Sequence, residues 1–284
     1  MDRIGIDQAA AEISEHCIGK RAHETPYFFI VGAGLSASVV PQASKVIEML
    51  RKRAADSKRQ IPPPPSDDPM TEYGHWFRNV LNSRGQQRAF LEGLMRNAEI
   101  SAENLRLALL LLNGKIGNIV VTPNFDDFLS RALTLFGHRH VVSDNAYTSV
   151  RIRPESPEIQ IVHVHGTYWF YDCANLEQDI VERARAGDAE GTTTLDLLTF
   201  LLRTRSPIVI GYSGWDKDVI MRALSKRLQQ HQQFPLEYPL YWCCYNEDDL
   251  SRLPACIKDH PNSDVRVVVP EALLSTSVKS METP

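Results

Sequence analysis

The residues best suited to chemistry form four short clusters, and each cluster follows an apolar run. In chain order they are Gly32-Ala33-Gly34-Leu35-Ser36, Thr122-Pro123-Asn124-Phe125-Asp126, His165-Gly166-Thr167 and Gly211-Tyr212-Ser213-Gly214-Trp215-Asp216. Glycines after a strand admit a close ligand, and the backbone N–H groups of a helix that follows suit a phosphate. Histidine, asparagine and aspartate add a proton acceptor, an amide and a carboxylate. The first cluster, with these groups, indicates a nucleotide site.

Each cluster also has a simpler structural interpretation. Asn124 or Asp126 can be the N-cap of a following helix, and His165 can be a hydrogen-bonded core histidine. Gly211–Gly214 can form a plain turn, and a strand that ends in Gly-x-Gly can be a tight strand-to-helix turn. Ser38 stands where the dinucleotide fingerprint has its third glycine, which argues against an ordinary Rossmann dehydrogenase. Only the four clusters taken together favour a ligand site.

Short apolar runs alternate with helical patterns along most of the chain, as in a parallel sheet covered by helices on both faces. The expected strands are 27–31, 119–121, 159–164, 207–210, 240–244 and 265–269. The expected helices are 7–22, 44–55, 126–136, 193–204 and 215–230, with a helical stretch at 72–113 that is interrupted near 83–85 and 99–102. We therefore predict an α/β fold, a doubly wound Rossmann-like parallel sheet with an inserted helical subdomain.

The domain organisation follows from the same pattern. Residues 1–274 are expected to form one domain, with the helical insertion at about 60–113 and a flexible tail at 275–284. The proline-rich segment 61–69 interrupts regular structure at the start of the insertion. Ser101 is expected to be an N-cap, with Asn104 in the first turn of the helix. In a parallel sheet the four clusters would meet at one edge, where ligands bind.

Composition excludes several classes of function. The chain has 284 residues, of which 43% are hydrophobic, so it can bury a core. The formal net charge is −4 and no dense block of Lys and Arg occurs, so direct nucleic-acid binding is not expected. The basic residues at 51–53 and 58–59 fit the polar end of a helix.

Compartment and membrane association follow from other sequence features. The longest apolar run, 107–112, is too short to cross a membrane, and the N-terminus has no signal-peptide pattern. Five cysteines occur without a CxxC pair, which excludes a zinc ribbon and a thioredoxin-type motif. We therefore expect a soluble protein of the reducing cytoplasm, without membrane association.

The four clusters together resemble the sequence motifs of a known protein superfamily. The order and spacing of GAGLS, TPNFD, HG and GYSGWD, over roughly residues 27–218, are similar to the signatures of the sirtuin superfamily. Those signatures are a GAG-x-S loop, a T-x-N-x-D segment, a His-Gly pair and a late G-x-S loop. The resemblance implies a Rossmann-like fold that binds NAD⁺ in an inverted manner relative to dehydrogenases and cleaves the nicotinamide–ribose bond.

The chain lacks several sequence features of the sirtuin deacetylases, so its resemblance is to other members of the superfamily. Deacetylases have two CxxC pairs after the His-Gly pair, whereas this interval has only Cys173. The segment 39–43 lacks the Gly-Ile-Pro-Asp-Phe-Arg run, and Pro123 replaces the usual glutamine. The chain is more similar to zinc-free sirtuin-like domains, which are NAD⁺-hydrolysing effectors of bacterial antiphage systems. This implies NAD⁺ as the substrate, no metal, and control by a sensor module, a partner protein or a homo-oligomer.

The expected catalytic roles combine the resemblance with elementary chemistry. His165 would take a proton from water or a ribose hydroxyl, a role for which histidine side chains are suited because they exchange protons near neutral pH. Asn124 would hold the ribose or the water, and Asp126 would orient the nicotinamide amide or stabilise the developing cation.

Other residues would bind the nucleotide. Gly32, Ala33, Gly34 and Ser36 would hold the pyrophosphate, Ser213 would contact phosphate or ribose, and Thr122 and Gly211 would complete the NAD⁺ contacts. Asp216 is expected to cap the next helix rather than to catalyse.

Some assignments stay open at the level of sequence. His163 and His165 are expected to face the same side of a strand, and a His-x-His pair can bind zinc, yet no third ligand is evident. The aromatic residues 168–171 can wall the pocket, pack at an edge or contact a partner. The predicted function is an NAD⁺ hydrolase that acts as a defence effector. The alternatives are an NAD-dependent protein deacylase and a non-catalytic NAD or ADP-ribose sensor.

Overall fold

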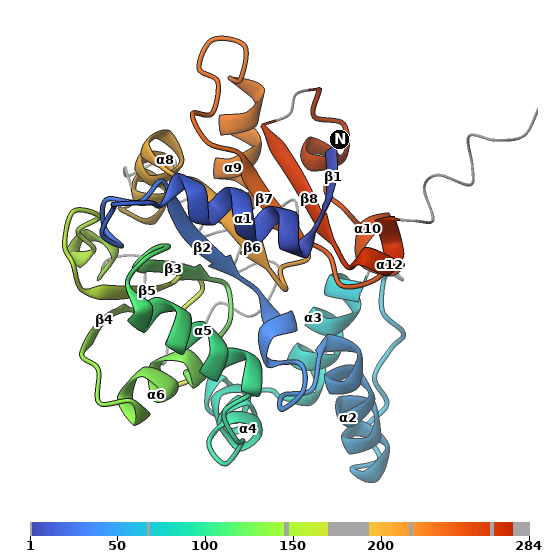
Figure 1. Cartoon of the computed structure of the whole chain (residues 1–284). Helices are drawn as coiled ribbons and strands as arrows, with labels where there is room; N and C mark the ends of the chain where they lie inside the picture. Colours follow the sequence, from blue (N-terminus) through green and yellow to red (C-terminus); the bar gives the residue numbers. More distant parts are fainter. Residues whose placement is uncertain are drawn as a thin grey trace, which may run out of the picture.

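The fold is built on one parallel sheet (Figure 1). The computed structural model describes residues 2–66, 69–144, 148–169, 193–215, 218–261 and 264–274. In this part of the chain the strands follow the order β1-β8-β7-β6-β2-β3-β5-β4, and every neighbouring pair is parallel. Their bounds are β1 Asp2–Gly5, β2 Tyr27–Val31, β3 Ile119–Thr122, β4 His140–Ser143, β5 Ile159–His163, β6 Ser206–Ile210, β7 Leu240–Cys243 and β8 Val265–Val269. The predicted fold class is confirmed.

All six predicted strands are present, and two further strands were missed. The predicted strands are β2, β3, β5, β6, β7 and β8. They are mostly apolar, and helices on both faces of the sheet bury them. The missed strands, β1 and β4, are the two edge strands. Each has four residues, and half or more of them remain partly or fully exposed. They therefore lack the continuous apolar run that marks a buried strand.

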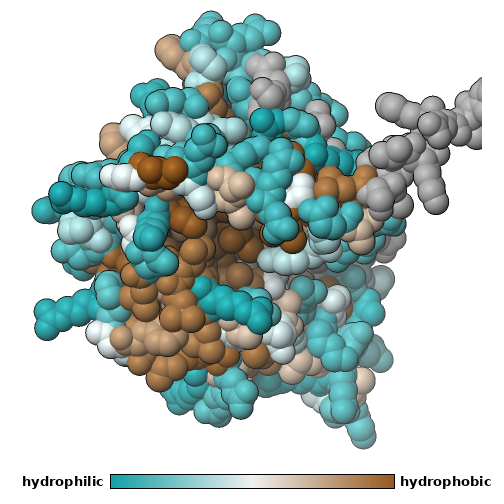
Figure 2. Space-filling model, viewed as in Figure 1, coloured by the Kyte–Doolittle hydropathy of each residue, from teal (hydrophilic) through white to brown (hydrophobic). Residues whose placement is uncertain are grey.

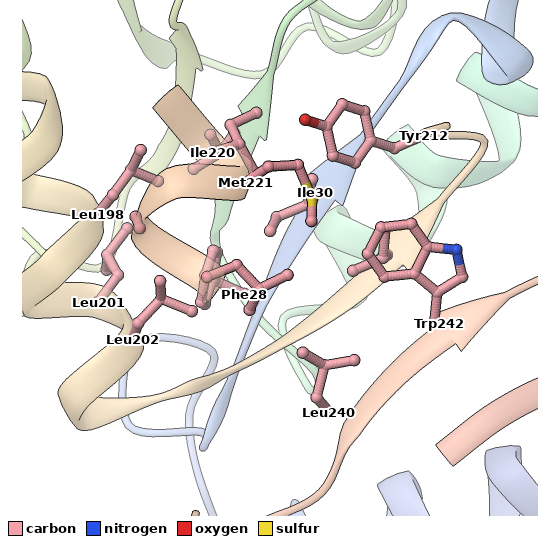
Figure 3. Close-up of a cluster of buried hydrophobic side chains, with 14 of the residues drawn as sticks. Phe28, Ile30, Leu198, Leu201, Leu202, Tyr212, Ile220, Met221, Leu240 and Trp242 are labelled. Carbon is pink, nitrogen blue, oxygen red and sulfur yellow. The ribbon is translucent and has the colours of Figure 1, made fainter. Parts of the chain in front are cut away.

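Helices cover both faces of the sheet. One face packs against α1 (Ile6–His16), α5 (Ala102–Asn113) and α6 (Phe128–Leu135). The other packs against α8 (Thr193–Thr204) and α9 (Val219–Gln229), and Figure 3 shows its buried side chains. Alternate β2 residues enter the two layers, so Phe28 faces α8 and α9 while Phe29 faces the opposite side. The shorter helices are η2 Thr148–Arg151, α10 Glu247–Ser251, α11 Ala255–Lys258 and α12 Glu271–Leu274.

Three helices form a separate subdomain near the end of β2. They are α2 (Ala43–Asp56), α3 (Pro69–Val80) and α4 (Arg84–Met95), and they share their own hydrophobic cluster (Figure 1). Helix α5 packs on the sheet rather than in this cluster, and the expected insertion at about 60–113 stays a prediction. The predicted N-cap of α5 is confirmed, since Ser101 Oγ accepts the Asn104 N–H at 3.1 Å.

The strand order reverses at β2, and this reversal locates the ligand crevice. From β2 the chain continues through β3 to β5 on one side, whereas β6, β7 and β8 extend the sheet on the other. In open α/β sheets, ligands bind outside the carboxyl ends of the strands at such a switch point. The loops after β2 and β6 meet there.

Apolar side chains also reach the surface on the face with α5 and α6. Leu109, Leu135 and Phe136 are exposed, and Figure 2 shows apolar residues gathered over these two helices. Within the described residues, no helix is both long enough and apolar enough to cross a membrane.

Candidate active site

The first and fourth clusters lie against each other at the switch point. Gly32 N–H donates to the Ile210 carbonyl and Gly34 N–H donates to the Gly211 carbonyl, each at 2.9 Å. A Cβ on Gly32 would lie 2.3 Å from the Gly211 oxygen, and a Cβ on Gly34 would lie 2.8 Å from the Gly211 Cα. Gly211 itself has φ of +61°, which favours glycine. These glycines are therefore required for the contact between the two loops, whatever else they bind.

The loop after β2 does not lead directly into a long helix. Residues Ala33–Ser36 form a single 3₁₀ turn, η1, and α2 begins only at Ala43, within the insertion. The helix that begins beside the glycines is therefore one 3₁₀ turn with Gly32 as its N-cap, not the longer helix expected. Ala33 and Gly34 are exposed, whereas Leu35 and Ser36 are buried. A ligand can reach the first two residues without displacing the core.

Two residues of the second cluster form a polar network with the first. Asn124 Nδ2 donates to the Gly32 carbonyl at 3.1 Å. Asp126 Oδ1 accepts the Phe128 N–H at 3.3 Å, and the carboxyl lies near the Ser36 and Asn124 side chains. Desolvation raises the pKa of Asp126 to about 6, although these three neighbours oppose the increase. Asp126 thus caps the first turn of α6 through the Phe128 N–H, and it also lies beside Ser36 and Asn124.

Thr122 fixes the segment between β3 and Asn124. Its hydroxyl donates to the Val31 carbonyl at 2.7 Å and accepts the Asn124 N–H at 3.0 Å. The hydroxyl therefore holds the ends of β2 and β3 together and sets the direction of the chain at Asn124. A contact of Thr122 with NAD⁺ remains a prediction.

Helix α5 and its N-cap are hydrogen-bonded to the first cluster. Ser101 Oγ donates to the Leu35 carbonyl at 2.9 Å, and Asn104 Nδ2 donates to Ser36 Oγ at 3.1 Å. Asn104 was not predicted as part of the site. Its signal in the sequence is a polar residue at a position that helical periodicity places on the apolar face of a leucine-rich helix.

His163 lies beside Asn124. Its Nδ1 donates to the Asn124 carbonyl at 2.8 Å, and its buried Nε2 has no hydrogen-bond partner among the described residues. Burial lowers the pKa of His163. The ring lines a cavity of about 20 Å³ together with Asn104, Asn124 and Asp126. That volume holds about one water molecule, so a nucleotide cannot occupy it without a movement of its walls.

His165 lies in a different environment, against a buried carboxylate. Its Nε2 is 3.1 Å from Oδ1 of Asp218, and the two side chains are only 4% and 3% exposed. Asp218 is the N-cap of α9, where Oδ1 accepts the Ile220 N–H at 3.2 Å, and Oδ2 accepts the Tyr212 hydroxyl at 2.6 Å. Burial alone would raise the pKa of Asp218, but His165 and these hydrogen bonds hold it below its usual value.

The two histidines do not share a face of the sheet. Strand β5 ends at His163, and the following turn includes Gly166 with φ of +83°. His163 lines its cavity with Ile161, on the side of α5 and α6, whereas His165 contacts the start of α9. The expectation of a shared face is therefore wrong. Among the described residues no group of three potential metal ligands occurs.

The other predicted residues divide between described and undescribed segments. Ser213 is exposed in the loop after β6. Tyr168 packs on the insertion and donates to Asp127 Oδ2 at 3.3 Å, and the Trp169 ring lies edge-on to His163. Asp216, Cys173 and the aromatic residues 170–171 lie outside the described residues. Asp218 therefore takes the capping role at the start of α9, and the sequence interpretation had missed it.

Comparison with protein families is consistent with this geometry. The family model described as SIR2-like domain matches residues 118–260, which is half of the chain. The match begins just before β3, ends just after α11, and includes the clusters at Asn124, His165 and Gly211. The glycine loop after β2 precedes it. No curated protein matches the sequence.

Proposed function

Because the chain belongs to the SIR2-like domain family, whose members are NAD-utilising enzymes, we propose that it is an NAD⁺ glycohydrolase. In this proposal it is a defence effector that depletes NAD⁺ when activated. The main support is the convergence of the clusters at the carboxyl ends of four neighbouring strands, β6, β2, β3 and β5. That edge combines an exposed glycine turn, the Asn124–Asp126 network and a histidine with a carboxylate partner.

The proposed reaction is hydrolysis of the bond between nicotinamide and ribose. The exposed turn at Ala33 and Gly34 receives the pyrophosphate, and the Asn124 amide, once released from the Gly32 carbonyl, holds the ribose or the attacking water. The water oxygen bonds to the ribose C1′ while the bond from C1′ to nicotinamide breaks, and its electron pair leaves with the neutral nicotinamide. His165 accepts the proton of the water and later releases it to solvent. The products are ADP-ribose, nicotinamide and one proton.

Asp126 is suited to stabilise the charge that develops during this step. Its pKa of about 6 leaves the carboxyl mostly ionised at neutral pH, in a desolvated position where a charge interacts strongly. Positive charge develops on the ribose as the bond breaks, and a fixed carboxylate favours that distribution. Asn124 and Asp126 line the same cavity, which supports a role for both groups at one part of the substrate.

Control by a partner is also part of the proposal. The His165 side chain is 4% exposed, the Asn124 amide is bonded to the Gly32 carbonyl, and the adjoining cavity is about 20 Å³. These observations favour a closed conformation that must open before NAD⁺ reaches the histidine. A sensor module, a partner protein or self-assembly would provide the opening, and the cytoplasm would provide the NAD⁺.

The test is to incubate the purified chain with NAD⁺ and to quantify nicotinamide and ADP-ribose by chromatography. A parallel series includes an acetyl-lysine peptide, and a third varies protein concentration to change self-assembly. We expect nicotinamide and ADP-ribose in equal amounts without peptide. Release that requires the peptide would replace the proposal with a deacylase. Saturable NAD⁺ binding without release in any series would replace it with a sensor.

A further inference from the structure

The contact between His165 and Asp218 has a defined chemical consequence. We propose that Asp218 positions His165 with its proton on Nε2, so that Nδ1 is the atom that accepts the proton of the attacking water. Tyr212 in turn fixes Asp218. The inference rests on the proposed hydrolysis and deepens it by assigning a positioning pair and the reacting nitrogen.

Three groups contact the carboxylate of Asp218, from His165, Tyr212 and Ile220. Oδ1 lies 3.1 Å from His165 Nε2 and accepts the Ile220 N–H at 3.2 Å, and Oδ2 accepts the Tyr212 hydroxyl at 2.6 Å. An ionised carboxylate is only an acceptor, so the imidazole nitrogen that faces it carries hydrogen. The lowered pKa of Asp218 keeps the carboxylate ionised. This arrangement assigns the hydrogen of the neutral ring to Nε2.

The other ring nitrogen is then left as the base. A neutral imidazole has one N–H donor and one acceptor, so a hydrogen on Nε2 leaves the lone pair on Nδ1. Both ring nitrogens of His165 are buried without a geometrically defined hydrogen bond among the described residues, and of the two it is Nε2 that lies 3.1 Å from the Asp218 carboxylate. Buried polar atoms without a partner are rare in folded proteins and mark positions where a water or a ligand binds. Nδ1 is thus available to the attacking water.

Helix capping alone does not explain an aspartate at this position. The cap needs only a side-chain oxygen for the Ile220 N–H, and asparagine caps helices about as well as aspartate. A buried charge is costly unless it is paired, and here it faces His165 and Tyr212. Tyr212 packs against Trp242 in the core, and Figure 3 shows its hydroxyl directed away from Trp242, toward Ile220 at the start of α9.

The pair would act when the bond to nicotinamide breaks. The proton of the water moves to Nδ1 as the water oxygen bonds to the ribose C1′, and His165 becomes an imidazolium. Asp218 keeps its negative charge and stabilises the positive ring, as a buried carboxylate does beside the histidine of a catalytic triad. Asp218 touches no substrate, so it is a positioning residue.

The test uses Asp218→Asn in the full chain. The variant keeps the helix cap and removes the charge that faces Nε2. We expect the kcat of nicotinamide release to fall by about 100-fold or more, with a much smaller change in KM. Nitrogen NMR of the His165 ring is expected to show hydrogen on Nε2 in the wild type and also in the variant, because the side-chain oxygen that caps Ile220 is the one that faces Nε2. Asp249→Asn, at the start of α10, is the matched control and is expected to change neither readout.

A second variant covers the case in which Asp218→Asn fails to fold. Tyr212→Phe keeps the aromatic packing and removes the hydroxyl that holds Oδ2, and we expect kcat to fall by about 10-fold. Hydrogen on Nδ1 in the wild type, or a kcat that is unchanged in Asp218→Asn, would overturn the inference. The NMR result does not depend on activity. Failure of the proposed hydrolysis would instead appear as absent nicotinamide release from a protein with the expected tautomers.

Discussion

Gly32 and Gly211 are in direct contact across the ends of β2 and β6. A Cβ on Gly32 would lie 2.3 Å from the Gly211 oxygen and 2.4 Å from the Tyr212 Cα, so the backbones leave no room for a side chain. The contact joins the loop that would bind the pyrophosphate to the loop that carries Tyr212. Through Tyr212 the second loop reaches Asp218 and His165. The glycine loop after β2 and His165 are thus linked by a short series of contacts.

Replacing Gly32 with alanine is expected to disrupt this contact. Because both clashing atoms belong to backbone, the loops must separate, and we expect a loss of about 1–3 kcal/mol in the free energy of unfolding. Urea denaturation measures it. Gly93→Ala is the control, since Gly93 is exposed in α4 and a Cβ there meets nothing within 4 Å. That variant is expected to gain up to about 1 kcal/mol. Equal stability of the two variants would contradict the packing described here.

Ser101 and Ser83 allow the anchoring of the phosphate loop to be separated from helix capping. Both cap a helix, but only Ser101 also donates to the Leu35 carbonyl. Each alanine variant is expected to lose about 1 kcal/mol of stability. Only Ser101→Ala is expected to weaken NAD⁺ binding, because it also frees the turn at Leu35. Calorimetric titration with NAD⁺ compares them, and equal affinities would show that α5 does not fix the loop.

The raised pKa of Asp126 predicts that the free energy of unfolding depends on pH. Its pKa is raised from 3.8 to about 6 in the folded protein, so the native state binds more protons than the unfolded state between these values. Stability conferred by the neutral form is present below about pH 4 and is lost as the pH rises through 6, by at most about 3 kcal/mol. The difference in unfolding free energy between wild type and Asp126→Asn is expected to fall over this window. A difference that is constant from pH 4 to 7 would contradict the raised pKa.

The hydrogen bond that His163 donates to the Asn124 carbonyl is expected to stabilise the folded protein. His163→Leu leaves the Asn124 carbonyl without its 2.8 Å donor, and we expect a loss of about 1–3 kcal/mol in unfolding free energy. His163→Asn retains a donor near the Nδ1 position and is expected to lose less. Thermal denaturation of the two variants provides the comparison. A leucine variant as stable as the asparagine variant would show that the hydrogen bond contributes nothing.

Sequence patterns predicted the elements whose side chains are buried on both faces of the sheet. The run Tyr27–Val31 was predicted with its observed bounds, because five consecutive buried residues leave few alternatives. The edge strand His140–Ser143 was missed, since three of its four residues are only half-buried. The packing of α2 on α3 was not predictable, because α2 has the pattern of any amphipathic helix and nothing in its sequence distinguishes α3 from the sheet as its partner.

The site was predictable as a set of clusters but not as a set of contacts. Asn124, Asp126 and Ser36 are adjacent in the structure because parallel strands bring their carboxyl ends together. The carboxylate at His165 was not predictable, because Asp218 and Asp216 look equivalent as helix caps in the sequence. The opposite placement of His163 and His165 also depends on where β5 ends, and strand ends are the least certain feature of a sequence pattern.

NAD⁺ hydrolysis at His165 and Asn124 is tested by comparing nicotinamide release by wild type, His165→Ala and Asn124→Ala, with NAD⁺ binding measured on the same samples. His138→Ala, an exposed histidine after α6, is the control for loss of an imidazole elsewhere. We predict release by wild type and by His138→Ala, and none by His165→Ala or Asn124→Ala. Release by His165→Ala at the wild-type rate, or a wild-type protein that neither binds nor cleaves NAD⁺, would contradict the account.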